Sequence, residues 1–187
     1  MPEAQLSQPV EVRPTAELTP AELAAARALM AAAWPDPEDV FSDEDWAHAL
    51  GGWHALVRDE GGVIISHGSV VPRRIWIGEH LVAAGYVEAV ATRPSRQGRG
   101  LGSAVMRALG GLIAERFELG VLSTDDGGFY ARLGWEPWHG PTWVRRATGP
   151  ERTPDDDGGL WVLRTARTAA FSGGEAIACE ERPGDDW

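Results

Sequence analysis

The stretch Gln97-Gly98-Arg99-Gly100-Leu101-Gly102 decides the fold, because it joins a strand-like apolar segment to a segment with helical periodicity. Glycines at such a junction remove side-chain bulk, so that backbone N–H groups at the start of the helix can surround an anion, and the helix dipole favours negative charge there. The predicted ligand of this loop is a pyrophosphate. The alternative interpretation is a glycine-rich turn that only changes the direction of the chain.

The segments on either side of this stretch have different periods. Apolar residues recur at helical spacing from residue 101 to residue 113. Before the glycines, residues 53–58, 63–74 and 81–92 are strand-like and predict a three-stranded antiparallel meander. A dinucleotide fingerprint needs an early strand–helix–strand unit instead, so a Rossmann cofactor is disfavoured.

Further elements are expected on both sides of this region. Thr19-Pro20-Ala21-Glu22 has the spacing of a capping box with proline at the first helical position. Residues 149–159 (GPERTPDDDGG) have no periodicity and predict a loop. The remaining expected elements are helices at 23–34, 42–51 and 128–133, and strands at 120–123, 134–138, 160–165 and 175–180.

Composition narrows the function classes. The chain has 187 residues, 17 basic and 28 acidic, and a formal net charge of −11, which disfavours nucleic-acid binding. A hydrophobic content of 43% suits a single globular domain over 1–187, with residues 1–9 as a disordered leader and 149–187 as a loop and strands on the substrate side. Cys179 alone provides no disulfide framework, and the histidines show no metal-ligand spacing. We expect no metal, no membrane segment and a cytoplasmic location.

Glu88 lies inside the apolar run Leu81 to Ala91, where a carboxylate without a partner would be costly to desolvate. One interpretation is a strand-end carboxylate paired with Arg73 or Arg74. The other is a general base whose pKa is raised by burial, suited to deprotonating an amine. Tyr130, taken alone in an apolar helix, is more often a core aromatic residue than a proton donor.

The glycine pattern together with Phe129-Tyr130-Ala131-Arg132-Leu133-Gly134-Trp135 resembles the acetyl-CoA-binding core of the GNAT superfamily of N-acetyltransferases over roughly residues 60–140. Further segments resemble one branch, the aminoglycoside 2′-N-acetyltransferases, from about residue 40 to the last residue. They are Asp45-Trp46, Leu50 to Ala55, Gly85 to Ala91, Trp138 to Thr142, Arg152 to Gly158 and Gly184-Asp185-Asp186-Trp187.

The resemblance implies an α/β (α+β) GNAT fold, with a mixed, twisted sheet of about seven strands flanked by about four helices. It also implies acetyl-CoA as the co-substrate, with its pyrophosphate on the glycine-rich loop and its pantetheine arm along the edge of the 90–92 strand. The cofactor-binding residues expected on this basis are Val90, Ala91, Thr92, Gln97, Gly98, Arg99, Gly100, Leu101, Gly102 and Ser103.

The resemblance also assigns catalytic roles. Glu88 becomes the general base, acting on the amine through water, and Tyr130 becomes the general acid that protonates the leaving thiolate. The segment from Ser123 to Tyr130 is a couple of residues shorter than its family counterparts. An ungapped alignment places Val40 at one substrate position, whereas a one-residue insertion places Asp39 there, and we choose Asp39. The expected substrate-binding residues are Asp39, Glu88, Ala89, Ser123, Asp155, Asp156, Asp185 and Trp187.

The function expected from the resemblance is acetylation of the 2′-amino group of aminoglycoside antibiotics, with resistance as the phenotype. Clustered carboxylates suit such a polycationic ligand. The family also implies a homodimer. Two alternatives remain open: a GNAT enzyme for another amine, such as a kasugamycin-type aminosugar, a polyamine or a thiol-metabolite precursor, and a non-catalytic acidic module that binds cationic drugs.

Overall fold

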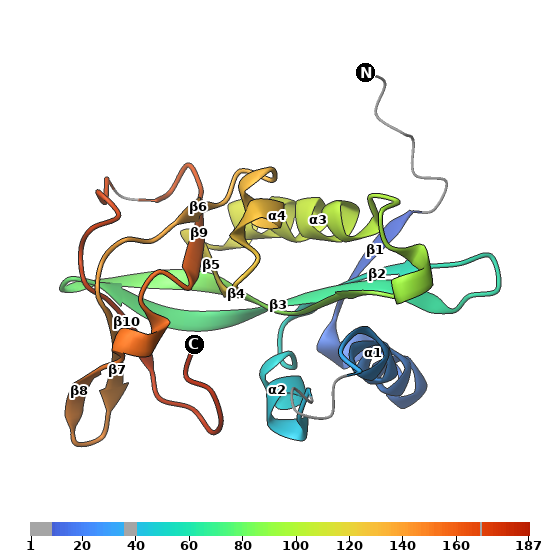
Figure 1. The fold of residues 1–187 in the computed structure, drawn as a ribbon, viewed down its shortest axis with the longest axis horizontal. Coiled ribbons are helices and arrows are strands. Elements are labelled where there is room, and N and C mark those ends of the chain that lie inside the picture. Colours follow the sequence, from blue (N-terminus) through green and yellow to red (C-terminus); the bar gives the residue numbers. More distant parts are fainter. Residues whose placement is uncertain (1–8, 36–40, 169) are drawn as a thin grey trace. The chain divides into compact units, whose positions relative to one another are not determined.

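The computed structural model describes residues 9–35, 41–168 and 170–187, which fall into two compact units. The N-terminal unit comprises Met1–Val71 and Glu88–Leu109, and the C-terminal unit comprises Pro72–Val87 and Gly110–Trp187. The chain passes from one unit to the other within β3 (Ile64–Ile77), β4 (His80–Thr92) and α3 (Leu101–Arg116) (Figure 1). The single domain expected from the sequence remains a prediction.

The strands of the N-terminal unit follow the order β1-β2-β3-β4, with β1 at Val10–Pro14 and β2 at Trp53–Arg58. Strand β2 runs antiparallel to both β1 and β3, as the predicted meander requires, and its register with β3 shifts between Val57 and Arg58. Strand β1 was not predicted, although Val10, Glu11, Val12 and Arg13 alternate apolar and polar side chains as a strand does.

Helices cover both faces of the strands in this unit (Figure 1). Helix α1 (Pro20–Ala33) begins at the predicted capping box, in which Thr19 and Glu22 satisfy each other's backbone N–H groups. Helix α2 (Asp43–His48) begins in the same way at Ser42. One core cluster of this unit joins α1 to β2, β3 and β4; its buried members are Leu18, Ala26, Leu29, Met30, Leu56, Ile64 and Ala91.

On the other face, α3 packs closely on β3 at Gly68. A Cβ atom at Gly68 would lie 2.9 Å from Cγ1 of Val105 and 3.1 Å from Cδ1 of Leu109, and both of these side chains are fully buried. Glycine is therefore required at this position for the helix to approach the strand. The close approach fixes α3, and with it the glycine-rich loop that precedes the helix.

The strands of the C-terminal unit follow the order β6-β9-β5-β4-β3-β10-β7-β8. Strand β5 is parallel to β4 and β7 is parallel to β10, whereas β5–β9, β3–β10 and β7–β8 are antiparallel. Helix α4 spans Gly127–Ala131. The strands not yet bounded are β5 (Leu119–Ser123), β6 (Glu136–Pro137), β7 (Thr142–Arg146), β8 (Gly149–Arg152), β9 (Leu160–Arg164) and β10 (Ile177–Glu180).

The C-terminal unit contains two strands, β7 and β8, that the sequence did not predict. The predicted loop 149–159 contains β8 and the short 3-10 helix η3 (Pro154–Asp156), because residues 149–152 pair with the unpredicted strand β7. The described part of the chain thus holds ten strands rather than about seven, together with the four α-helices expected.

Buried tryptophans fill the core of this unit. Trp138 is almost completely buried, and its indole N–H donates to the carbonyl of Glu175 at 3.0 Å. A Cβ atom at Gly140 would lie 1.7 Å from the same carbonyl oxygen, so residue 140 has no room for a side chain. Within the described ranges, none of the helices has both the length and the apolar composition that crossing a bilayer requires.

Candidate functional site

The predicted base, Glu88, lies on β4 where the strand departs from regular geometry. The next residue, Ala89, has φ of +52°, and it is the only non-glycine residue in the described ranges with a positive φ. An alanine in this conformation is strained, because its Cβ approaches the carbonyl oxygen. Residues 88–90 are half-buried, between the buried residues 84–87 and the buried Ala91.

Side chains of β3 hold the backbone of β4 around this irregularity. The hydroxyl of Ser69 donates to the carbonyl of Glu88 at 3.2 Å, and Nδ1 of His67 lies 2.7 Å from the carbonyl oxygen of Ala89. The hydroxyl of Ser66 donates to the carbonyl of Ala91. All three side chains are fully buried. The sequence reasoning missed them, although three polar residues within an apolar strand were a visible signal.

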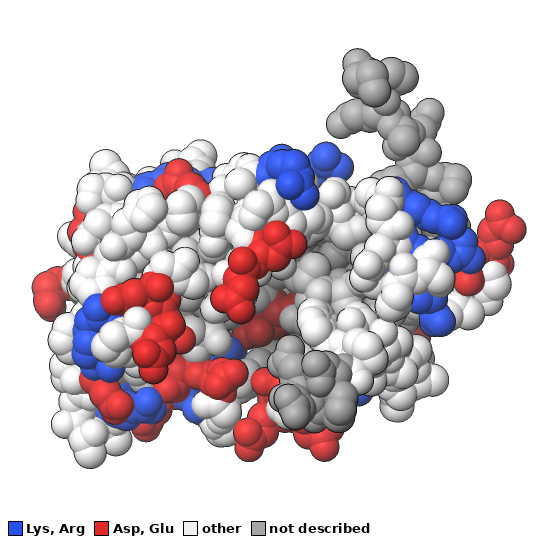
Figure 2. Space-filling view, viewed as in Figure 1, with Lys and Arg blue, Asp and Glu red and all other residues white. Residues whose placement is uncertain are grey.

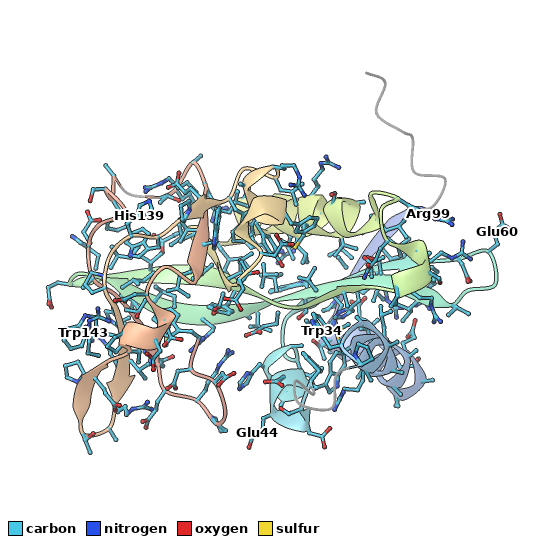
Figure 3. All side chains as sticks on the ribbon, viewed as in Figure 1. Trp34, Glu44, Glu60, Arg99, His139 and Trp143 are labelled. Atoms are coloured by element: carbon cyan, nitrogen blue, oxygen red, sulfur yellow. The ribbon has the colours of Figure 1, made fainter. Side chains whose placement is uncertain are left out.

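The glycine-rich loop has the geometry of an anion site. Gly98 and Gly100 have φ of +72° and +78°, and open space surrounds the position of a Cβ atom at each. Residues 97–100 are exposed, and Arg99 extends from this loop in Figure 3. Helix α3 begins at Leu101, so its first backbone N–H groups, which have no partner within a helix, belong to this loop. These features fit a pyrophosphate, the group expected here.

Tyr130 lies on α4, beside β9 in the C-terminal unit. Burial raises the pKa of the Tyr130 phenol to about 12, and the negative charge of Asp126 adds to this effect. The phenol therefore remains protonated at neutral pH and can donate a proton. Gly127 allows the close packing of α4, because a Cβ atom there would lie 1.9 Å from the ring of Trp161. Ser123, at the exposed end of β5, lies near Gly159.

Several carboxylates gather in the C-terminal unit. The pKa of Asp156 is raised, first by partial burial and then by the negative charges of Asp155, Asp185 and Asp186, while a hydrogen bond from Thr153 opposes the shift. These four residues come from η3 and from the C-terminal segment, and we call them the acidic cluster. Figure 2 shows acidic side chains interleaved with basic ones in the region of β7, β8 and η3.

Asp157 has a different role from its two neighbours. Its carboxylate pairs with Arg152 at 2.5 Å and accepts hydrogen bonds from the backbone N–H and the hydroxyl of Thr142. These partners lower the pKa of Asp157, with the hydrogen bond from Arg152 as the largest cause. Asp157 therefore fixes the η3 turn, which leaves Asp155 and Asp156 as the carboxylates presented by that turn.

The C-terminal segment is held by a group of arginines and one aspartate that we call the tail clamp: Arg73, Arg146, Arg182 and Asp186. Arg73 donates to the carbonyls of Asp186 and Glu180 at 2.7 and 2.9 Å. The carboxylate of Asp186 pairs with Arg146 at 2.9 Å and accepts from the backbone N–H of Arg182 at 3.0 Å. The clamp places Trp187 in a buried position, 7% exposed. The tail clamp could not be predicted from the sequence, because Arg73 and Asp186 are 113 residues apart.

The predicted residues fall into both units. The cofactor-binding residues, Glu88 and Ala89 belong to the N-terminal unit. Tyr130, Ser123, Asp155, Asp156, Asp185 and Trp187 belong to the C-terminal unit. The joint action of Glu88 and Tyr130 therefore remains a prediction. Asp39, and its alternative Val40, lie outside the described residues.

Metal ligation has no support in the described ranges, where no group of three or more His, Cys, Asp or Glu side chains has a geometry that could hold an ion. His139 and Trp143, which Figure 3 labels, also lie in the C-terminal unit but are not members of the acidic cluster.

Comparison with known proteins identifies relatives for most of the chain. Residues 14–138 match the family described as acetyltransferase (GNAT) domain. An aminoglycoside 2′-N-acetyltransferase from Mycolicibacterium fortuitum is 44% identical over 154 residues, which cover 80% of this chain and 78% of that protein.

Solved structures show the same fold. A GNAT family N-acetyltransferase from Escherichia coli, in complex with CoA, matches with a TM-score of 0.68 and 18% identity over 98% of this chain and 97% of that chain. A conserved protein of unknown function from Enterococcus faecalis matches with a TM-score of 0.58 and 17% identity over 72% of this chain, which spans only 33% of that larger protein. At these identities the likeness concerns the fold, and it confirms the mixed α/β arrangement predicted from the sequence.

Proposed function

This chain belongs to the GNAT family of acetyltransferases, and we propose that it transfers the acetyl group of acetyl-CoA to the 2′-amino group of aminoglycoside antibiotics. The observation that carries the proposal is the 44% identity to an aminoglycoside 2′-N-acetyltransferase over 154 residues. This identity is far above that of the solved structures that share only the fold. The expected consequence for a cell is resistance to these antibiotics.

Acetyl-CoA is assigned to the N-terminal unit. The open, positive-φ glycines Gly98 and Gly100 and the N-terminus of α3 support a pyrophosphate site that includes Gln97 to Ser103. The β4 segment Val90 to Thr92 would bind the pantetheine arm by backbone hydrogen bonds. A backbone N–H near Val90 would stabilise the oxyanion that forms on the thioester carbonyl.

Catalysis is assigned to Glu88 and Tyr130. Glu88 accepts a proton from the substrate ammonium through a water molecule, and the resulting amine attacks the carbonyl carbon of the thioester. When the tetrahedral intermediate collapses, the C–S bond breaks and Tyr130 donates its phenolic proton to the thiolate, while the nitrogen loses its second proton to give the neutral amide and a proton is returned to the phenolate. The pKa of about 12 for Tyr130 supports this role, because the phenol carries its proton at the pH of the reaction.

The acceptor is assigned to the acidic cluster, with Asp155, Asp156 and Asp185 facing ammonium groups and Trp187 contacting the sugar. Partial burial and mutual repulsion raise the pKa of Asp156, and a cationic ligand would relieve that repulsion. Ser123, Ala89, Glu88 and Asp39 complete the proposed acceptor set. A homodimer in the cytoplasm is part of the same proposal.

Steady-state assays with thiol detection test this function. The purified chain receives acetyl-CoA and a panel of acceptors: aminoglycosides with a 2′-amino group, a kasugamycin-type aminosugar and a polyamine. We expect turnover with the 2′-amino compounds. Turnover confined to another amine would reject the acceptor assignment, and drug binding without thiol release would indicate a non-catalytic binding module.

Two conservative variants test the catalytic pair. Glu88→Gln and Tyr130→Phe should each lower kcat by roughly 10²- to 10⁴-fold, the usual contribution of a general base or acid, while the affinity for acetyl-CoA changes little. Arg107→Gln, on the exposed side of α3, is the matched control and should behave like the wild type. Full activity in both catalytic variants would contradict the mechanism.

A further inference from the structure

Two buried histidines in the N-terminal unit form a hydrogen-bonded chain that ends at β4. Nδ1 of His54 lies 2.9 Å from Nε2 of His67, and Nδ1 of His67 lies 2.7 Å from the carbonyl oxygen of Ala89. At the other end, the hydroxyl of Thr15 lies 2.8 Å from Nε2 of His54. We call Thr15, His54 and His67 the histidine cluster.

The acceptor at the end fixes the direction of every hydrogen bond in this cluster. A carbonyl oxygen can only accept, so Nδ1 of His67 carries the proton, and Nε2 of the same neutral ring must accept. Nδ1 of His54 therefore donates to His67, and Nε2 of His54 accepts from the hydroxyl of Thr15 at 2.8 Å. The other acceptor near this hydroxyl, the carbonyl of Gly52 at 3.1 Å, also accepts from the backbone N–H of Thr15. A single arrangement of protons satisfies all four groups.

Burial keeps both rings neutral. His54 and His67 are fully buried, and burial lowers the pKa of His54 to about 4 and that of His67 to about 3. The ring of Trp46 lies 5.8 Å from the ring of His67 and 6.3 Å from that of His54, on the side of α2. Two imidazoles in a fully buried position are costly unless their polar atoms are used, and here those atoms are used to hold one carbonyl group.

The carbonyl group in question belongs to the strained residue. Ala89 keeps φ of +52° only if its surroundings over-determine that conformation. His67 holds the carbonyl of Ala89 and Ser69 holds the carbonyl of Glu88, so two side chains of β3 fix two successive peptide groups of β4. The peptide group held by Ser69 adjoins Cα of Glu88, and the one held by His67 fixes the next residue, so together they constrain the backbone from which the side chain of Glu88 extends.

We propose that His67, oriented by His54 and Thr15, is a positioning residue for acetyl transfer: it holds Ala89 in the left-handed conformation and thereby aims the carboxylate of Glu88. The inference rests on the proposed function, in which Glu88 is the general base. His67 takes no proton from the substrate, because its two nitrogens are both engaged within the cluster. Displacement of a catalytic group by about 1 Å can cost roughly 10²-fold in rate.

Paired substitutions of nearly the same shape isolate the hydrogen bond. In His67→Asn the side-chain amide can take the place of Nδ1–H and donate to Ala89, whereas His67→Leu has a similar branched shape and no donor. We expect His67→Leu to lower kcat by about 10- to 100-fold, with KM for acetyl-CoA changed by less than about threefold, and His67→Asn to restore most of the activity. Equal activity in the two variants would overturn the proposal.

A second pair covers the case in which substitutions at His67 prevent folding. His54→Asn preserves a donor to Nε2 of His67, and His54→Leu removes it. The proposal predicts a lower kcat for the leucine variant than for the asparagine variant, at equal helix and strand content by circular dichroism. The same kcat in both folded variants would contradict the orienting role of His54.

A double-mutant cycle with Glu88→Gln separates this inference from the proposed function. If His67 acts through Glu88, His67→Leu should lower kcat by less than about twofold once Glu88 is glutamine. Additive losses would overturn the positioning role while leaving the base assignment intact. Unchanged turnover in Glu88→Gln alone would instead reject the proposed base.

Nitrogen-15 NMR of histidine-labelled protein provides a direct signature. Both rings should be neutral Nδ1–H tautomers at pH 7, and the resonances that are missing from the spectrum of the His67→Asn variant assign the ring of His67. An Nε2–H tautomer at His67 in the wild type would contradict the direction of the chain and the proposal with it.

Discussion

The histidine cluster of the N-terminal unit and the tail clamp of the C-terminal unit both fix a backbone segment, but the first uses neutral side chains and the second uses charged ones. Each uses side-chain donors to hold backbone carbonyls in a segment that carries predicted site residues. The two histidines of the histidine cluster are neutral and fully buried, whereas the tail clamp is ionic and Arg146 is 31% exposed. The histidine cluster should therefore respond to acid and the tail clamp to salt.

Acidification should have the largest effect, through the histidine cluster. The folded-state pKa values of His54 and His67, about 4 and about 3, lie below the ordinary value of 6.5. The unfolded chain then binds more protons below pH 6.5, so the contribution to stability is present above pH 6.5 and is lost as the pH falls. At pH 5 we expect a loss of about 2 kcal/mol for each histidine in urea unfolding experiments.

The matched control for this effect is the double variant His54→Leu/His67→Leu. It lacks both titrating rings, so its free energy of unfolding should vary much less between pH 7 and pH 5. The same dependence in the wild type and in the double variant would show that other groups dominate. The proposed difference between the histidine cluster and the tail clamp in their response to acid would then be wrong.

Substitution of Arg73 should have the next largest effect, because this residue holds two carbonyls of the tail clamp. Arg73→Leu should lower the free energy of unfolding by about 2 kcal/mol and raise KM for the aminoglycoside, while KM for acetyl-CoA stays unchanged. Arg73→Lys can reach only one carbonyl at a time and should give an intermediate KM. An unchanged acceptor KM in Arg73→Leu would separate the clamp from the acceptor site.

Asp186→Asn should have a smaller effect that depends on salt. Removing its ion pair with Arg146 should cost about 1 kcal/mol at low ionic strength and less in about 1 M salt, where charges are screened. The control is Asp43→Asn, because Asp43 pairs with Arg27 while its side chain is 99% exposed, and its loss should change little. A loss for Asp186→Asn that is equal at both salt concentrations would contradict an ionic clamp.

The smallest effect expected is a rise in stability. Ala89→Gly removes the steric strain of φ +52° and should stabilise the protein by up to about 1 kcal/mol in thermal unfolding. Activity should fall a few-fold at the same time, since a glycine holds Glu88 less firmly. A variant that gains both stability and activity would show that the strain at residue 89 has no part in positioning the base.

Local patterns in the sequence predicted much of the fold. The capping box at Thr19, the meander before the glycines and the helix after them all have short-range signals, and the structure contains each of them. Strand β1 has such a signal in the alternation of Val10, Glu11, Val12 and Arg13, whereas β7 and β8 lack one. Their existence depends on partners in the sheet, and β7 lies beside β10, which is more than 30 residues further along the chain.

The candidate site shows the same division. The motif around Gln97 and the aspartates near residue 155 could be identified from sequence, and the structure groups Asp155, Asp156 and Asp185. The residues that support the site could not be identified. Arg73 contacts a segment over 100 residues away, and the role of His67 depends on the strained backbone at Ala89, which has no signature in an alanine.

The position of the acetyl group on the product tests the central claim most directly. The chain is incubated with acetyl-CoA and two aminoglycosides that differ only in carrying a 2′-amino or a 2′-hydroxyl group, and each product is analysed by mass spectrometry and two-dimensional NMR. The account predicts one added acetyl group, on the 2′-nitrogen, and no product from the hydroxyl analogue. Acetylation at another amine, or equal turnover of both compounds, would contradict it.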